Sequence, residues 1–356
     1  MSMNPCFRKA RFIQAKRVHQ LSQRLSTIRY EEYGHPFQVL KKEEDEKETH
    51  ITENQIAIKM LAAPIHVADL SQIQGNYAIR PPLPAIAGNE GVALVTAVGS
   101  NVQHLKVNDH VVTCKPGFGT WRLKAVADAK DVVKVSKKIE LGDAATLSVN
   151  PATAYILLKE FQDLKEGDVV IQNAANSAVG MAVIQLAALR GIKTINIVRD
   201  DADYDLTNEH LKCLGGTIVA TADYLGSATF KRLIADLPAP KLALNAVGGR
   251  SSLELGRVLG RKGVHVTYGG MSRQCVMIGT GSLIFHDISL RGFWMSEWFK
   301  NTPHEKRVAL LQELAGLVEQ GKLRNYIQTY KFTDFEDALA AAVNRTTKRK
   351  VVMLMD

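Results

Sequence analysis

A short segment between an apolar run and a helical pattern has residues suited to binding a phosphate. Val169 to Ala174 is apolar and rich in β-branched residues, which is typical of a strand buried on both faces. Small residues follow from Ala175 to Gly180, and apolar residues then recur at helical spacing as far as Gly191. Backbone N–H groups and the dipole at the start of such a helix bind anions. The order strand, tight turn, helix therefore indicates a dinucleotide-phosphate site.

The turn itself matches only part of the dinucleotide pattern. Of the three glycines in Gly-x-Gly-x-x-Gly it keeps the third, Gly180, while Ala175 and Ser177 occupy the first two places. Taken alone, the turn fits an ordinary βαβ unit without a ligand equally well. A polar pair, Arg199-Asp200, follows a second buried strand about 20 residues later, where a ribose would bind.

The positive charge of the chain is concentrated near its start. The 356 residues carry a net charge of +9, yet residues 1–29 hold seven Lys or Arg and no acid. The other residues are almost balanced, with 38 basic and 36 acidic side chains, so the charge does not indicate a nucleic-acid partner. The acid-free, Arg-rich segment 1–29 predicts a mitochondrial transit peptide, with a basic tail as the alternative.

Cysteine usage and hydropathy exclude two further classes. The four cysteines, at positions 6, 114, 213 and 275, are far apart and have no metal-ligand spacing. This pattern predicts a reducing compartment, without a disulfide framework or a structural zinc site. No apolar run approaches 18 residues, so we predict no membrane span.

The elements that must position the turn fall into two patterns. Residues 30–149 show short apolar runs separated by Gly and Pro, which indicate a mostly β domain. From Leu141 helical and strand patterns alternate, which predicts a parallel, doubly wound sheet. Thr302–Glu305 and Thr333–Glu336 have the capping-box pattern that begins a helix, and Lys350–Met355 reads as a final strand.

Several short motifs, taken in order, resemble the medium-chain dehydrogenase/reductase superfamily. They are Ala62–Ile65, Gln74–Tyr77, Pro84–Gly91, Gly119–Trp121, Val149–Tyr155, Ile171–Ala174, Tyr268–Met271 and Arg291–Trp294. Within the superfamily they are most similar to the mitochondrial enoyl thioester reductases. The resemblance covers nearly the whole chain from about residue 30. It implies an α/β protein with a GroES-like, mostly β catalytic domain (30–149 and 294–356) and a Rossmann domain with a doubly wound parallel sheet (150–293).

The same resemblance bears on metal content. Zinc alcohol dehydrogenases supply Cys and His ligands at two places that here read Ile65-His66 and Asn89-Glu90, without a cysteine. A catalytic zinc needs three protein ligands and an open position, and a lone His is more often a packed or surface residue. We therefore predict no metal, which favours reduction of enoyl or quinone compounds over alcohol oxidation.

The family resemblance implies NADPH-dependent reduction of a trans-2-enoyl thioester, carried by CoA or acyl carrier protein, in mitochondrial fatty acid synthesis in the matrix. Hydride would add to C3, negative charge would develop on the thioester oxygen, and C2 would receive a proton. The resemblance assigns the hydrogen-bond and proton donor to Tyr77, because a phenol is protonated at neutral pH. It also implies a homodimer formed through the edges of the Rossmann sheets.

Cofactor-binding residues are carried over from the family by position. They are Asn150, Asn176, Ser177, Ala178, Val179, Arg199, Asp200, Asp201, Tyr268, Gly269, Gly270, Met271, Phe293, Trp294, Met295, Ser296 and Lys350. Trp294 would line the pocket, with a core aromatic as the alternative. Arg199 could pair with a 2′-phosphate where an NAD enzyme places an acid, which favours NADPH.

Two other functions are compatible with these residues. One is an NADPH quinone reductase of the same superfamily, which would be indifferent to Tyr77. The other is a catalytically silent, cofactor-binding paralogue, suggested by Ala178, where the family often has glycine, and by Asp201, where it tends to have a basic residue. Relative turnover of enoyl thioesters and quinones distinguishes the three.

Overall fold

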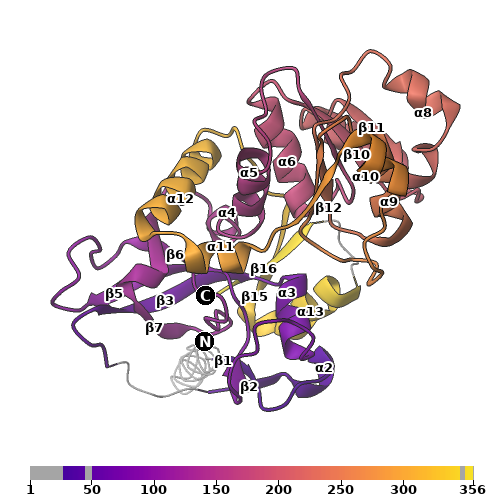
Figure 1. Cartoon of the computed structure of the whole chain (residues 1–356). Helices are drawn as coiled ribbons and strands as arrows, with labels where there is room; N and C mark the ends of the chain where they lie inside the picture. Colours follow the sequence, from indigo (N-terminus) through magenta and orange to yellow (C-terminus); the bar gives the residue numbers. More distant parts are fainter. Residues whose placement is uncertain (1–26, 45–49, 345–348, 356) are drawn as a thin grey trace, which may run out of the picture. The chain divides into compact units, whose positions relative to one another are not determined.

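The computed structural model describes residues 27–44, 50–344 and 349–355 (Figure 1). The chain divides into two units: unit 1 comprises Met1–Ala145 and Ile327–Asp356, and unit 2 comprises Thr146–Tyr326. Most of the predicted transit peptide lies outside the described residues. Its predicted end at residue 29 overlaps the first strand, which begins at Thr27 and carries a fully buried Ile28.

Unit 1 is built mainly from strands. Its elements are β1 (Thr27–Tyr30), α2 (Pro36–Val39), β2 (Lys41–Glu43), β3 (Gln55–Pro64), α3 (Val67–Ile73), β4 (Ala85–Ile86), β5 (Val92–Val98), β6 (His110–Thr113), β7 (Lys124–Asp128), η1 (Ala129–Asp131), β8 (Val132–Val135), α4 (Leu141–Ala145), β15 (Ile327–Lys331), η3 (Phe332–Asp334), α13 (Phe335–Asn344) and β16 (Lys350–Leu354). The strands form one sheet in the order β2-β1-β4 and another in the order β15-β16-β3-β5-β6-β8, with β7 also paired to β3.

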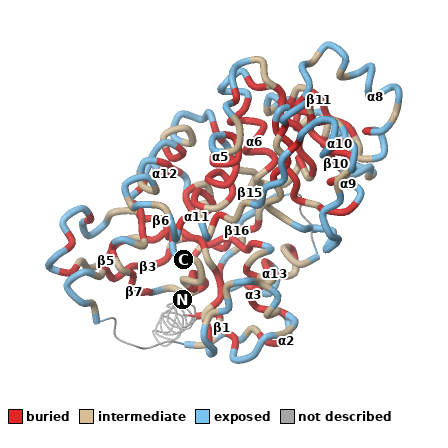
Figure 2. Tube along the Cα trace, viewed as in Figure 1, coloured by how far each residue is buried: buried red, intermediate tan, exposed pale blue. Residues whose placement is uncertain are grey.

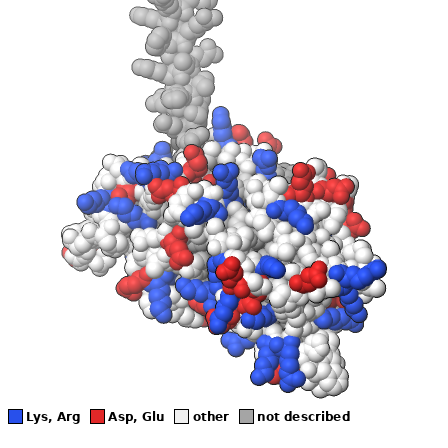
Figure 3. Space-filling model, turned by 90° about the horizontal axis from the view of Figure 1, so that it is seen from above, with Lys and Arg blue, Asp and Glu red and all other residues white. Residues whose placement is uncertain are grey.

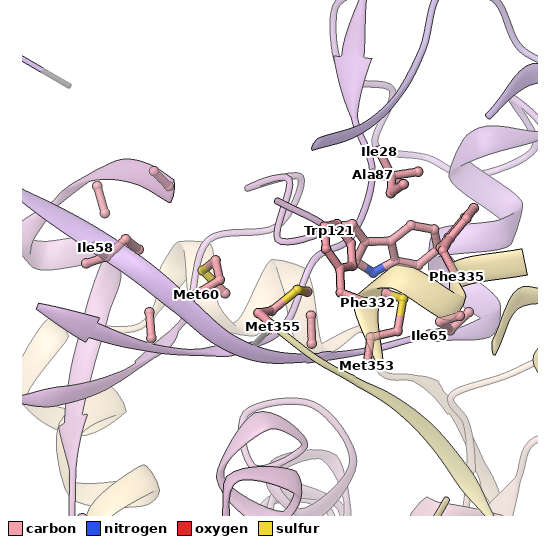
Figure 4. Close-up of a cluster of buried hydrophobic side chains, with 14 of the residues drawn as sticks. Ile28, Ile58, Met60, Ile65, Ala87, Trp121, Phe332, Phe335, Met353 and Met355 are labelled. Atoms are coloured by element: carbon pink, nitrogen blue, oxygen red, sulfur yellow. The ribbon is translucent and has the colours of Figure 1, made fainter. Parts of the chain in front are cut away.

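The C-terminal strand completes unit 1. β16 pairs antiparallel with β3, so that Val352 lies opposite Pro64. The core beside it contains the fully buried Trp121, whose ring lies 5.7 Å from the ring of Phe335 (Figure 4). The Trp121 Nε1–H donates to the carbonyl of Pro64 at 3.1 Å. Residues of η3, α13 and β16 are therefore part of the same core as residues of β1 and β3.

Unit 2 alternates helices and strands. Its elements are α5 (Asn150–Glu160), β9 (Val169–Gln172), α6 (Ala178–Ala188), β10 (Lys193–Val198), α7 (Tyr204–Cys213), β11 (Ile218–Thr221), η2 (Ala222–Tyr224), α8 (Ala228–Leu233), β12 (Leu242–Asn245), α9 (Gly249–Val258), β13 (Val264–Thr267), α10 (Thr280–His286), β14 (Ser289–Gly292), α11 (Met295–Asn301) and α12 (His304–Glu319).

The sheet of unit 2 confirms the predicted doubly wound topology. Its order is β11-β10-β9-β12-β13-β14, and each neighbouring pair is parallel. The chain extends the sheet from β9 to one side and then returns to add β12 on the other, which is the topological switch point of such folds. The residues of β9 and β12 are buried, as expected for strands covered on both faces. The neighbouring β10 is also mostly buried (Figure 2).

The boundary near residue 294 differs from the sequence expectation. The family resemblance implies that residues 294–356 belong to the first domain, whereas α11 and α12 lie in unit 2 and the chain enters unit 1 at Ile327. Contacts with α5 explain the difference. Trp298 Nε1–H donates to Glu160 at 3.0 Å, and the Tyr155 hydroxyl donates to Glu313 at 2.6 Å.

The two capping boxes predicted at Thr302–Glu305 and Thr333–Glu336 do not form. Helix α12 begins at His304 with Pro303 at the N-cap, and no side chain caps it. Thr333 lies within η3, and its hydroxyl contacts Asp334 rather than a helix N–H. The predicted helices are nevertheless present, because their apolar faces pack against their own units. Leu311 and Leu314 of α12 are fully buried.

Basic and acidic side chains are interspersed over the face shown in Figure 3. In the part of the chain that the structure describes, no helix combines the length and apolar character that a membrane crossing requires.

Candidate active site

The segment Ala175–Gly180, here called the phosphate turn, has the local geometry that its residues predict. Ser177 is the N-cap of α6, and its side chain accepts the backbone N–H of Gly180 at 3.2 Å. A Cβ on Gly180 would lie 2.5 Å from the carbonyl oxygen of Ala175, so only glycine fits there. Ala178 and Val179 form the first turn of α6. The free N–H groups and the dipole of this turn favour an anion.

The other predicted cofactor residues of unit 2 follow the carboxyl ends of its strands. Arg199–Asp201 follow β10, Tyr268–Met271 follow β13, and Phe293–Ser296 follow β14. Because all these strands are parallel, their carboxyl ends lie along the same edge of the sheet as the turn after β9. The structure thus places residues from four separate segments along one edge.

The hydroxyl of Tyr268 shows that this edge suits a polar ligand. Its Oη is buried and lacks a well-formed hydrogen bond. Burial raises the pKa of the Tyr268 phenol, while the nearby Ser177 side chain opposes the rise. A buried polar atom without a partner is costly, and a bound phosphate or ribose would satisfy it. The residues present therefore fit a nicotinamide dinucleotide.

An amide pair at the switch point supports the same edge and was not identified as functional from sequence. Asn173 Nδ2 donates to Asn245 Oδ1 at 2.8 Å, which ties the ends of β9 and β12 together. Asn173 Oδ1 accepts the N–H of Ala246, and Asn245 Oδ1 also accepts the N–H of Gly248. Both amides are buried and hold the loop after β12 in place. A polar residue at the end of a buried strand is the sequence signal that marks them.

A shallow cavity of about 490 Å³ lies at the ends of β13 and β14. It is lined by Glu160, Thr267, Gly292, Phe293, Trp294, Glu297 and Trp298. Two of the predicted residues, Phe293 and Trp294, are in this lining. Trp294 therefore faces a cavity, which favours the pocket interpretation over that of a core aromatic.

The remaining predicted residues of unit 2 differ in exposure. Asn150 is the first residue of α5 and is buried. Arg199 and Asp200 are exposed directly after β10, where side chains can reach a ligand. Asp201 is partly buried and accepts the N–H of Asp203 at 3.1 Å, so its carboxylate helps to form the loop before α7.

Tyr77 lies in a loop of unit 1 that is held at both ends. The loop follows α3, and Gly75 adopts a positive φ of 71° there. A Cβ on Gly75 would lie 3.0 Å from the side chain of Tyr33, whose hydroxyl donates to the Pro81 carbonyl at 3.2 Å. Tyr33 thus spans the loop, and the Tyr77 side chain is half-buried within it.

Lys350 belongs to a buried set of charges that the sequence analysis missed. Its ammonium donates to the carbonyl of Ile65 at 2.7 Å and contacts His66 Nδ1 at 2.8 Å. On the other side of the ring, His66 Nε2 lies 2.6 Å from Glu90 Oε2. Asp69 accepts the backbone N–H of His66 at 2.6 Å. We call these four side chains, Lys350, His66, Glu90 and Asp69, the charge cluster.

Asn89 joins the charge cluster to its surroundings. Its Nδ2 donates to Asp69 at 2.6 Å and to Gln72, and its Oδ1 accepts the N–H of Gly117. Glycines flank Asn89 and Glu90 for steric reasons, since a Cβ on Gly88 would lie 2.3 Å from the Trp121 ring. His66 is therefore not the lone histidine that the sequence predicts.

In the described ranges, 27–44, 50–344 and 349–355, no three His, Cys, Asp or Glu side chains are grouped so that they could hold a metal ion. The expectation that the reaction needs no metal stays a prediction.

The fold, the turn and the strand-end residues define a two-domain, nucleotide-binding dehydrogenase. In agreement, residues 52–137 match the alcohol dehydrogenase GroES-like domain, and residues 220–353 match the zinc-binding dehydrogenase family.

Curated and solved relatives narrow the class. The chain is 42% identical to the mitochondrial enoyl-[acyl-carrier-protein] reductase of Dictyostelium discoideum, over 95% of this chain and 98% of that protein. It therefore belongs to the family of mitochondrial enoyl-[acyl-carrier-protein] reductases. The structure of Etr1p with NADP and crotonyl-CoA is similar, with a TM-score of 0.85 and 32% identity over 93% of this chain and 99% of that one. The Etr1p/Etr2p heterodimer from Candida tropicalis has a TM-score of 0.84, at 32% identity over 93% and 100% of the two chains.

Proposed function

We propose that this protein is an NADPH-dependent enoyl thioester reductase of mitochondrial fatty acid synthesis. The observation that carries the proposal is the likeness to an enoyl-[acyl-carrier-protein] reductase along 95% of the chain. The phosphate turn and the buried, unsatisfied Tyr268 hydroxyl give this chain the local chemistry that such an enzyme needs. The protein acts in mitochondria, and the basic segment that precedes β1 serves as its import signal.

The reaction assigns distinct tasks to the residues. When bound, NADPH supplies the hydride that C3 of the substrate double bond receives. Tyr77 donates a hydrogen bond to the thioester oxygen, where negative charge develops, and delivers a proton to C2. Arg199, exposed after β10, pairs with the 2′-phosphate that distinguishes NADPH from NADH. Ser177 and the N–H groups at the start of α6 bind the pyrophosphate.

A spectrophotometric assay tests the reaction. The purified protein should oxidise NADPH when crotonyl-CoA is added, faster than it oxidises NADH and faster than with a quinone as acceptor. Tyr77→Phe should lower kcat by at least about tenfold, the low end of what general acid catalysis supplies. Tyr224→Phe, on the surface of unit 2, is the matched control. Faster turnover of quinones, independent of Tyr77, would instead identify a quinone reductase, and tight NADPH binding without any turnover a silent paralogue.

The assembly is proposed to be a homodimer formed through β14. This strand is at the edge of the unit 2 sheet and all four of its residues are exposed. Apolar side chains before and within it are exposed as well: Val276, Met277, Leu283, Ile284, Phe285 and Leu290. An unpaired edge beside such a patch is suited to pairing with a second copy around a two-fold axis.

Sedimentation tests the interface. Phe285 is 73% exposed. Replacing it by Asp should convert the dimer into a monomer. Leu206→Asp is the control, because Leu206 is 68% exposed on α7 of the same unit and far from β14 in the sheet order. A monomeric unmodified protein, or a dimer that survives Phe285→Asp, would contradict the proposed interface.

A further inference from the structure

Two acceptors fix the ammonium of Lys350. The carbonyl of Ile65 and the ring nitrogen Nδ1 of His66 each lie within 2.8 Å of Nζ. A lysine ammonium has three N–H donors, so these contacts leave a third N–H for a ligand. Lys350 is the first residue of β16. Its two acceptors, Ile65 and His66, lie between the end of β3 and the start of α3.

The hydrogen bonds of the His66 imidazole indicate which forms of Lys350 and Glu90 are present on its two sides. Only one arrangement with an ammonium satisfies both ring contacts: Nδ1 accepts from Lys350, and Nε2–H donates to Glu90. A doubly protonated ring would place an N–H against the ammonium. The geometry is thus a chain of ammonium, neutral imidazole and carboxylate, in which the Glu90 charge acts on Lys350 through His66.

The other charged groups around the lysine also favour its ammonium form. Burial raises the pKa of the Asp69 carboxyl. Both of its oxygens nevertheless accept hydrogen bonds, from His66 N–H and from Asn89, and these donors and the nearby Lys350 favour its carboxylate form. Tyr30 of β1 faces Asp69, and burial raises its pKa to about 12, so it stays neutral. Burial lowers the pKa of Lys350 to about 8, while Asp69 and Glu90 oppose that change.

We propose that His66 and Glu90 are positioning residues that keep Lys350 charged for contact with NADPH, and that NADPH binding weakens when this lysine loses its proton. The inference rests on the proposed function, because it takes Lys350 as a cofactor contact. It adds His66 and Glu90 to the residues that support NADPH binding, and it predicts that this binding weakens at alkaline pH. Glu90 acts through the ring of His66 and through its charge, not by touching the reacting atoms.

The sign of the pH effect follows from the ammonium. Below about pH 8 Lys350 is charged and can donate to the cofactor. As the pH rises through that value, the lysine becomes neutral and loses its attraction for the anionic cofactor. Burial lowers the pKa of Lys350, and the charges of Asp69 and Glu90 oppose this effect. Without the Glu90 charge only Asp69 opposes it, so the lysine should lose its proton at a lower pH.

Fluorescence titration with NADPH from pH 6.5 to 9.5 tests the inference without turnover. The Kd of the unmodified protein should be constant at low pH and rise by about tenfold for each pH unit above about 8, as expected when one proton must be bound. A Kd that stays flat over this range overturns the inference, and this measurement requires no variant.

Glu90→Gln sharpens the test, because glutamine keeps an oxygen that accepts from His66 and removes only the charge. The rise in Kd should move down by at least about one pH unit, the low end of the effect of an opposite charge nearby. Glu31→Gln removes an exposed carboxylate that pairs with Lys41 and should leave the profile unchanged. An unshifted profile in a folded Glu90→Gln protein, or an equal shift in both variants, contradicts a role for Glu90.

The same preparations separate this inference from the proposed function. Crotonyl-CoA turnover at pH 7 is measured on the unmodified protein. Turnover together with a flat Kd profile rejects the inference alone. The expected Kd profile without turnover rejects enoyl reduction and leaves the role of His66 and Glu90 standing.

Discussion

The phosphate turn of unit 2 and the charge cluster of unit 1 deal with buried polarity in different ways. The turn uses backbone: N–H groups at the start of α6, a serine cap and a glycine that admits the Ala175 carbonyl. The cluster uses side chains: an ammonium and two carboxylates, with an imidazole that links Lys350 to Glu90. Backbone donors are local to one segment, whereas the cluster collects residues that lie up to 284 positions apart.

This difference predicts unequal sensitivity to substitution. When one side chain of the phosphate turn is changed, only part of its function should be lost, because the backbone N–H groups that bind the anion remain. A buried charge cluster loses more, because each member leaves another charge uncompensated. Substitutions in the two regions, each with a matched control, test the comparison.

The largest effect is expected from Lys350→Met. It leaves Asp69 and Glu90 buried without their ammonium and should lower the free energy of unfolding by about 3–5 kcal/mol. Lys134→Met is the control, since Lys134 is half-exposed and pairs with Asp109 at 2.8 Å, an interaction worth less than about 1 kcal/mol. Urea unfolding of the two proteins measures both values. Equal losses would show that the cluster is no more sensitive than a surface ion pair.

A smaller effect is expected from Gly180→Ala. The new Cβ would lie 2.5 Å from the Ala175 carbonyl oxygen, so the turn must move, at a cost of about 1–3 kcal/mol of stability. NADPH affinity should fall by at least about tenfold, equivalent to about 1.4 kcal/mol. Gly316→Ala, within α12, has room for a methyl group and should be neutral or stabilising. Unchanged NADPH binding in Gly180→Ala would remove the turn from the cofactor site.

The smallest effect on folding is expected from Ser177→Ala. Ser177 caps α6 and Ser227 caps α8 by the same contact, to Gly180 N–H and Phe230 N–H respectively. Each alanine variant should lose about 1 kcal/mol of stability, the usual value of an N-cap. Only Ser177→Ala should also weaken NADPH binding, by about tenfold, as expected when a hydrogen bond to a phosphate is lost. Equal NADPH affinities in the two variants would leave Ser177 as a cap alone.

Sequence patterns were sufficient where the determinants are local. The β9–α6–β10 unit follows from apolar periodicity and from Gly180, whose neighbours lie within five positions. Patterns were insufficient for helix α12, whose predicted cap does not form and whose place in unit 2 depends on contacts with α5.

By itself, the sequence determined the two kinds of unit, the parallel sheet and the phosphate turn, because hydrophobic spacing and turn residues act over a few positions. Only the tertiary structure decided that His66, which has no partner in the sequence pattern, lies between Lys350 and Glu90. The physical reason is that β16 returns from the end of the chain to pair with β3. Charges so far apart in the chain have no common period, and burial makes them partners.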